Sequence, residues 1–264
     1  KDYALIVNEA ALNSGKTPYF TNDVINNLKV STNWMDEMFA SNVPTQNYVL
    51  GLSGGGAASN YSMSLGYTSQ GGIVGGSKFS FFDRYTFRIN SEHKVYKDIL
   101  KFGEHLTFNY QNNHGLSVDG IYNNTLRSAY NTSPFLPMYD ANGAYFNAAN
   151  VGWYPGDPSR AWNTGESNPY ANMDYSTRSE SNNQKLFGDF YMIVEPLKGL
   201  KFRSSLGINY TPAESHGYRP VYRLSVYSFN DTATVWQSMS KGMGVQFDNL
   251  LSYDFGIKNH SFSV

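Results

Sequence analysis

Two twelve-residue stretches of the chain share one pattern of alternating polar and apolar residues. Residues 100–111 read LKFGEHLTFNYQ, residues 200–211 read LKFRSSLGINYT, and half of the aligned positions are identical. Every second side chain of a strand points to the same face of a sheet, so both stretches are predicted to be strands with one apolar and one polar face. The chain therefore carries the same two-faced strand twice.

The two predicted faces separate the side chains of these strands cleanly. The apolar face carries Leu106, Phe108, Leu206 and Ile208, and the polar face carries His105, Asn109, Arg203 and Asn209. If the sheet lies in a membrane, the first set is expected to face lipid and the second set a solvated lumen.

The same alternation predicts about eight strands after residue 44, joined by connections of two kinds. Short connections at 54–59, 95–99, 195–199 and 256–259 alternate with long ones at 71–82, about 112–182 and about 212–240. Short turns at one end and long loops at the other are typical of bacterial outer-membrane barrels. Strands of about ten residues are long enough to cross a bilayer when tilted.

Residues 1–43 have a different texture and are predicted to be helical, near the start of the barrel. Good helix formers fill residues 4–12, Thr21 or Asn22 is suited to cap a second helix, and Asn33 a third. We expect this to be the only helical part of the chain. The rest, residues 44–264, is assigned to barrel strands with a long extracellular loop at about 112–182.

These elements predict an all-β fold, a transmembrane antiparallel β-barrel with short helices at the N-terminus. Two alternatives stay open. The first is a secreted, soluble β-sandwich that binds glycans through its long loop, and the second is a passive porin, which would share the barrel but lack a plug.

Composition excludes several classes of function. A formal charge of -1 gives no electrostatic field for nucleic acid. Aromatic and charged residues each make up 16% of the chain, whereas about 25% of an ordinary soluble domain is charged. No apolar run approaches the roughly 18 residues of a membrane-spanning helix, and the mean hydropathy of -0.45 suits barrel strands, which hide their lipid contact in alternation.

The chain is expected to be a piece of a longer protein, because it starts within a helical pattern and stops within an alternating run. Its lack of a signal peptide is therefore uninformative. It contains no cysteine, so disulfides and thiolate chemistry are absent.

Motifs for catalysis or metal binding are weak or incomplete. The five histidines form no i, i+4 pair, and the stretch that starts at Asp140 lacks the glutamate of a calcium loop, since Val151 stands at its twelfth position. Residues 71–78 are glycine-rich but do not end as a phosphate loop does, and no nucleophile elbow occurs. We predict no enzyme activity, no metal and no cofactor.

The long loop is the expected place for a ligand. It combines many aromatic rings with asparagine and glycine, which suits a neutral polar ligand such as a sugar or peptide. The weak candidates for substrate contact are Trp153, Tyr154, Trp162 and Tyr170. Packing within the loop is the more common role of such rings.

An ordered set of short motifs resembles a known family. Along the chain run WMDEMF at 34–39, QNY at 46–48, LSGG at 52–55, NYSMSLGY at 60–67, GGIV at 71–74 and RYTFRIN at 84–90, with DNLLSY at 248–253. The first six motifs, in this order, resemble the early barrel region of the SusC/RagA family, the TonB-linked outer-membrane nutrient transporters of Bacteroidetes. The last motif, DNLLSY, is more loosely similar to a later strand of the family.

The resemblance implies a 22-stranded barrel with a plugged lumen in the bacterial outer membrane. It also implies import of an oligosaccharide or peptide, energy relayed by TonB, and a SusD-like surface lipoprotein as a lid. TonB would be engaged by a part of the protein that lies outside this sequence. Eight strands of such a barrel would have two unpaired edges and would depend on the remainder of the sheet.

The two-faced strands predict opposite tolerance to charge. Arginine in place of Phe108 or Ile208 should cost about 2 to 4 kcal/mol of unfolding free energy in the full-length protein, because the guanidinium would enter hydrocarbon. Arginine in place of the neighbouring Asn109 or Asn209 should cost little. Denaturant titration in lipid vesicles measures both, and equal tolerance of the two faces would contradict the lipid assignment.

Overall fold

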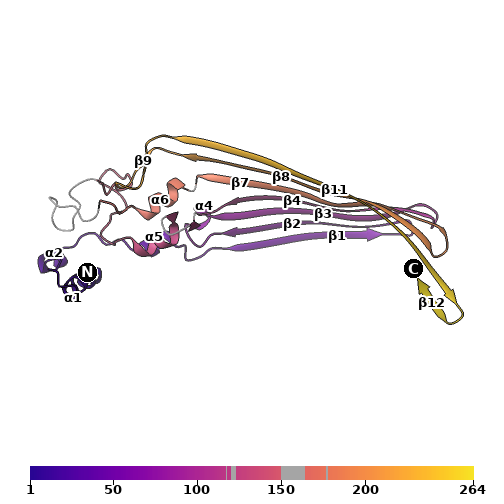
Figure 1. Cartoon of the computed structure of the whole chain (residues 1–264), viewed down its shortest axis with the longest axis horizontal. Coiled ribbons are helices and arrows are strands. Elements are labelled where there is room, and N and C mark those ends of the chain that lie inside the picture. The colour runs from indigo at the N-terminus through magenta and orange to yellow at the C-terminus, as the bar shows by residue number, and fades with distance from the viewer. Residues whose placement is uncertain (117, 120–122, 150–163, 177) are drawn as a thin grey trace.

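The chain forms one long antiparallel sheet with its helices gathered at one end (Figure 1). The computed structural model describes residues 1–116, 118–119, 123–149, 164–176 and 178–264. The order of the eight sheet strands is β1-β2-β3-β4-β7-β8-β11-β12. Their bounds are β1 Thr45–Gly55, β2 Ser59–Gly71, β3 Phe81–Tyr96, β4 Leu100–His114, β7 Ser179–Leu197, β8 Leu200–Arg219, β11 Thr234–Ile257 and β12 His260–Ser263.

In the described ranges, two small sheets lie outside the main one. Strand β5 (Val118–Asp119) pairs with β6 (Asn123–Asn124), and β9 (Tyr222–Arg223) pairs with β10 (Phe229–Asn230). The main sheet confirms the prediction of an antiparallel, mostly β chain with about eight strands. Its first and last strands do not pair with each other, so the sheet stays open.

The described residues form six helices, three of them outside the region where helices were expected. The first three, α1 (Asp2–Asn13), α2 (Asn22–Asn26) and α3 (Trp34–Met38), follow the sequence pattern, and Thr21 and Asn33 cap α2 and α3. The other three are α4 (Gly76–Phe79), α5 (Thr125–Asn131) and α6 (Pro169–Ser176). The expectation that only the first forty residues are helical was therefore wrong. These helices are short and are stabilised by packing against α3 rather than by a long apolar periodicity.

The connections follow the predicted alternation. Short turns join β1 to β2, β3 to β4, β7 to β8 and β11 to β12, and long connections join the other consecutive strands of the sheet. Figure 1 shows all the helices at the end of the sheet where the long connections lie, with the short turns at the opposite end.

Several strands are longer than the ten residues expected from the sequence. Strand β8 has 20 residues and β11 has 24, and their ladder continues to the pair Arg219 and Thr234. The connection expected at 212–240 therefore shrinks to residues 220–233. The added stretch carries polar side chains on both faces, so apolar alternation could not show it, although backbone pairing continues.

The two repeated stretches lie on β4 and β8, on either side of β7. Leu106 is opposite Gly188 of β7, and Gly188 is opposite Ile208, two positions beyond Leu206, the equivalent of Leu106 in the second copy. The copies are thus staggered by about one residue per strand. A stagger of this kind is what a tilted sheet needs in order to close into a barrel.

Nearly all buried apolar side chains of the described residues lie in the helical cap, not in the sheet. The cap comprises the helices and the long connections. Its three clusters are Ala4, Phe20, Ile25 and Phe135; Met38, Phe79, Ala129 and Met173; and Trp34, Leu136 and Ala148. In the described sheet strands, Tyr191 is the one buried apolar residue. The sheet consequently has no core of its own.

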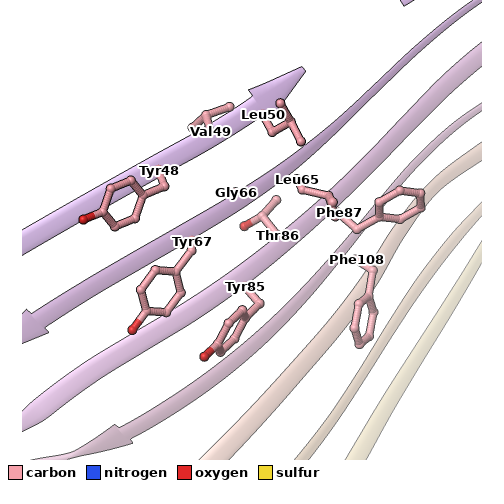
Figure 2. Close-up of a pocket in the computed structure, with 10 residues that line it drawn as sticks. All are labelled: Tyr48, Val49, Leu50, Leu65, Gly66, Tyr67, Tyr85, Thr86, Phe87 and Phe108. Carbon is pink, nitrogen blue, oxygen red and sulfur yellow. The ribbon is translucent and has the colours of Figure 1, made fainter. Parts of the chain in front are cut away.

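One face of the sheet is largely apolar. Tyr48, Tyr67, Tyr85 and Tyr110 form one row across β1 to β4, and the rings of Tyr67 and Tyr85 are 4.9 Å apart. Figure 2 shows a shallow groove on this face, lined by three of these tyrosines together with leucine and phenylalanine side chains. The side chain of Leu50 is 71% exposed in the isolated chain. No helix among the described residues has the length and apolarity needed to span a membrane.

The cap contains an acidic side chain, Glu166, whose carboxyl group is largely withdrawn from solvent and poorly compensated. Glu166 accepts a hydrogen bond from the backbone N–H of Ser133 through Oε1, while its Oε2 is buried and has no hydrogen-bond partner among the residues that the structure describes. The Trp34 indole N–H donates to the carbonyl of the same Ser133 at 3.0 Å. Burial raises the pKa of the Glu166 carboxyl above its ordinary value, and the Ser133 N–H only partly opposes this.

Close packing of β7 against β4 requires glycine at position 188, which gives a prediction. Gly188 has φ +150°, and a Cβ there would overlap the backbone oxygen of His105. Gly188→Ala should destabilise the full-length protein by about 1–3 kcal/mol or more in denaturant titration. Gly207→Ala is the matched control, because its Cβ would lie 3.5 Å from Gln246 Cβ, in ordinary contact. Equal stability of the two variants would contradict this packing.

Because of the Glu166 carboxyl group, we expect the free energy of unfolding of the cap to depend on pH. Since its pKa is raised in the folded protein, the protonated form favours the fold below the ordinary carboxyl pKa, and this advantage is lost as pH rises through the raised value. Glu166→Gln keeps an oxygen for the Ser133 N–H and removes the charge. The variant should resist pulse proteolysis of the cap at higher urea concentrations than wild type at pH 7, and the difference should shrink at pH 4. A variant weaker than wild type at pH 7 would be the opposite result.

Candidate functional site

A cluster of polar side chains spans four strands on the polar face of the sheet. At its centre, Asp189 of β7 lies between His105 of β4 and Arg203 of β8. Asp189 Oδ1 is 3.1 Å from His105 Nδ1, and Oδ2 is 3.5 Å from an Arg203 guanidinium nitrogen. The carboxylate therefore ties together two side chains that the sequence placed on one face.

Tyr191 extends the cluster toward the short turns. Its ring stacks on His105 with 5.2 Å between the centroids, and the Arg203 guanidinium carbon lies 4.3 Å from the Tyr191 ring centroid. The Tyr191 hydroxyl donates to Glu92 Oε2 at 3.2 Å, and Lys101 Nζ is 3.5 Å from Glu92 Oε1. This chain of contacts links β3, β4, β7 and β8 on one surface.

A glycine makes room for this ring. A Cβ at Gly103, directly opposite Tyr191 in the ladder, would overlap the Tyr191 phenol. The ring therefore lies flat over the backbone of β4 and is buried, although it belongs to the sheet face that carries mostly polar side chains. Gly103 thus lets the tyrosine bridge His105 to Glu92.

The cluster is balanced in charge when His105 is neutral. Asp189 and Glu92 offset Arg203 and Lys101, and all four lie at the surface, with side-chain exposures between 30% and 41%. Such an array offers donors and acceptors to a polar surface or ligand. Within the described ranges, no three histidine, aspartate or glutamate side chains are grouped so as to hold a metal ion.

The structure brings together two of the four predicted lumen-facing residues. His105 and Arg203 share Asp189, whereas Asn109 accepts a hydrogen bond from Thr86 Oγ1 at 2.8 Å and Asn209 lies opposite Phe187. All four are on one face. Leu106, Phe108, Leu206 and Ile208 lie on the other face, as the alternation predicted.

The sequence pattern did not predict three members of the cluster, which are Asp189, Tyr191 and Glu92. Strand β7 reads LFGDFYMI from residue 186, with large apolar residues at both odd and even positions, so the sequence pattern does not separate its two faces. The register of β7 against β4 assigns the faces, because it places Asp189 opposite His105. A search for acidic residues on the strand between the two repeats would have found Asp189.

One of the four predicted substrate residues can be placed. Tyr170 of α6 packs edge-on against Phe79 at 5.5 Å, and its ring centroid is 6.1 Å from that of Tyr145. Burial is the first cause that raises the pKa of Tyr170. Its contacts are those of a packing residue in the cap. Trp153, Tyr154 and Trp162 lie outside the described residues.

Further tyrosines of the cap form a connected group around Tyr145. Tyr145 stacks on Tyr139 at 5.5 Å and meets Tyr175 edge-on at 5.6 Å, and Tyr175 stacks on Tyr222 at 4.7 Å. Burial and the neighbouring Asp174 carboxylate raise the pKa of Tyr145 well above its ordinary value, so the phenol stays neutral. Tyr139 keeps 49% of its surface exposed and is the open edge of the group.

Comparison with known proteins gives relatives of one kind, although no family model matches the chain. The chain is 25% identical over 241 residues to TonB-dependent receptor P3 of Formosa agariphila, covering 89% of the chain and 22% of that protein. It is 37% identical over 78 residues to TonB-dependent receptor SusC of Bacteroides thetaiotaomicron, covering 30% of the chain and 7% of that protein.

Solved structures of the RagAB peptide importer share the fold. Its closed-closed state matches with a TM-score of 0.65 and 21% identity, over 89% of this chain and 25% of that chain. A second structure, of the RagAB peptide transporter, matches with a TM-score of 0.63 over 87% of this chain and 24% of that chain.

The chain corresponds to only a part of the proteins that it matches. It spans about a fifth of the length of the first relative and about a quarter of the matched structures. The motifs in the sequence, the relatives and the shared sheet agree. TonB-dependent receptors sit in the outer membrane and are transporters, not enzymes. In its sequence and in its sheet, the chain matches a fragment of the TonB-dependent receptors of the SusC/RagA family.

Proposed function

We propose that the full-length protein imports a nutrient across the outer membrane through a plugged β-barrel, with energy from TonB and a SusD-like lipoprotein as its lid. One observation carries this proposal. The eight-stranded sheet has an apolar and a polar face, all short turns at one end and the cap at the other, and it matches part of the RagA barrel. The closed barrel, with 22 strands, is part of the proposal.

The two faces then have different surroundings. Leu106, Phe108, Leu206 and Ile208 contact lipid, because an uncovered apolar surface of this extent is stable only against hydrocarbon or protein. The opposite face lines the lumen. There, the cluster around Asp189 contacts the plug or the passing substrate through its charged and hydrogen-bonding groups.

The soluble β-sandwich and the passive porin account for fewer of these features. A β-sandwich needs a second sheet against the apolar face, and none covers that face in the part of the chain that the structure describes. A passive porin shares the sheet but needs neither TonB nor a lid. It is therefore distinguished by the energy dependence of uptake.

The substrate proposed is an oligosaccharide or a peptide. The matched structures are of a peptide importer, and the cap offers the connected tyrosines from Tyr139 to Tyr222 as a stacking surface. Neutral phenols can stack on a sugar ring and donate hydrogen bonds to carbonyls of a peptide. Tyr170, which joins this group through Tyr145, would support the surface rather than form its open edge.

Energy-dependent uptake tests the proposal. Cells that lack the receptor are complemented with the full-length protein and supplied with labelled oligosaccharides and peptides. Import of one of these classes should saturate and should stop when a protonophore collapses the proton gradient or when TonB is deleted. Uptake that continues without TonB would favour the porin.

A variant in the polar cluster connects the same assay to the structure. Asp189→Asn keeps the size of the side chain but leaves Arg203 without its carboxylate, so we expect uptake to fall several-fold at equal surface level. The control is Asp254→Asn, which removes an aspartate 3.5 Å from Lys201 near the short turns and should leave uptake unchanged. Equal uptake by both variants would show that the cluster takes no part in import.

A further inference from the structure

One hydrogen-bonded group of three polar side chains lies on the apolar face. Ser91 and His93 of β3 and Glu104 of β4 lie on the same face, and Ser91 is directly opposite Glu104 in the ladder. The Ser91 hydroxyl donates to Glu104 Oε1 at 2.6 Å, and His93 Nε2 lies 2.8 Å from the same hydroxyl oxygen. Ser91 therefore holds the carboxylate on one side and the imidazole on the other.

The parity of the strands places this group on the apolar face. Glu104 alternates with Gly103 and His105, which lie under and beside Tyr191 on the polar face, and it shares its own face with Phe102 and Leu106. Phe190 of β7 is its neighbour across the ladder. A carboxyl group is thus set among phenylalanines and leucine.

The depth of the group follows from strand geometry. Glu104 lies six residues from Tyr110, toward the short turns, about 20 Å along the strand. The row of Tyr48, Tyr67, Tyr85 and Tyr110 corresponds to the belt of aromatic residues at the membrane interface on the long-connection side. With the strand tilt of a barrel, Glu104 lies about 15 Å from this belt along the membrane normal, which is past the middle of an apolar band about 25 Å tall. The carboxyl group is therefore in the leaflet on the short-turn side.

The nearby lysines cannot neutralise it. Lys94 and Lys101 lie on the polar face, where Lys94 is 2.8 Å from Asp98 and Lys101 is paired with Glu92. A carboxylate facing lipid is costly unless it has a partner. An occupant that brings a positive charge to this position would compensate it.

We propose that Glu104, Ser91 and His93 form a binding site for the ammonium-bearing headgroup of a phospholipid such as phosphatidylethanolamine. This proposal rests on the membrane placement proposed above. The Glu104 carboxylate receives the ammonium group, and the exposed His93 imidazole faces the phosphate beside it. Phe102 and Phe190 offer apolar contact to the acyl chains. Ser91 is a positioning residue, because it orients the carboxylate and is itself buried.

Lipid retention tests the site. The full-length receptor, as wild type or Glu104→Gln, is placed in nanodiscs with equal amounts of phosphatidylethanolamine, phosphatidylcholine and phosphatidylglycerol of the same acyl chains, and retained lipid is counted by native mass spectrometry. Wild type should retain phosphatidylethanolamine over the other two, because only its headgroup has ammonium N–H donors. Glu104→Gln should lower this preference about tenfold. Ser91→Ala, which leaves the charge in place, should lower it less.

A matched control and a second readout keep the outcomes separate. Glu214→Gln removes a carboxylate from the same face of β8 near the long connections, where Gln237 donates to Glu214 at 2.6 Å, and should not change the preference. Equal retention of the three lipids by wild type, or an unchanged preference in Glu104→Gln, would overturn the lipid site. If the receptor still imports its nutrient, only the lipid site has failed. If wild type does not enter the bilayer, both proposals fail.

Discussion

The structure depends on one constraint, which is that the sheet buries almost nothing by itself. Its strands run as long as 24 residues, yet the buried apolar side chains lie in the cap, and Tyr191 is the exception among the described strands. Backbone hydrogen bonds hold the ladder, but they do not cover the rows of Leu, Phe and Tyr on the apolar face. Hydrocarbon of the membrane covers the apolar face, and closure of the tilted sheet into a barrel pairs the backbone groups at the strand edges.

The constraint also explains why the two faces are built differently. Contact with lipid requires low polarity rather than specific partners, so the apolar face consists mostly of Leu, Phe and Tyr side chains in rows across the strands. The polar face is held by specific contacts, since Asp189 joins His105 to Arg203 and Tyr191 depends on Gly103. The cap has a third kind of order, an ordinary packed core formed by helices from distant parts of the chain.

Much of the sheet could be predicted from the sequence, because strands that meet lipid on one face and water on the other must alternate. The strands of the two repeats, β4 and β8, were found in this way. Strand β7 was harder, since Phe187 and Tyr191 put aromatic rings on its polar face and conceal Asp189. The added length of β8 and β11 and the helices α4 to α6 could not be predicted, because pairing and packing with distant residues stabilise them. Family resemblance supplied what alternation cannot, namely the plug, the lid and TonB.

The most direct test of the central claim measures the surroundings of each side chain. The chain has no cysteine, so single cysteines at 105 to 109 and 205 to 209 can carry a nitroxide label in the full-length receptor in vesicles. The accessibility of each label to oxygen, which partitions into lipid, and to a water-soluble nickel complex is then measured by electron paramagnetic resonance. The account predicts high oxygen accessibility at 106, 108, 206 and 208 and low values at the intervening positions. Equal accessibility at odd and even positions would contradict it.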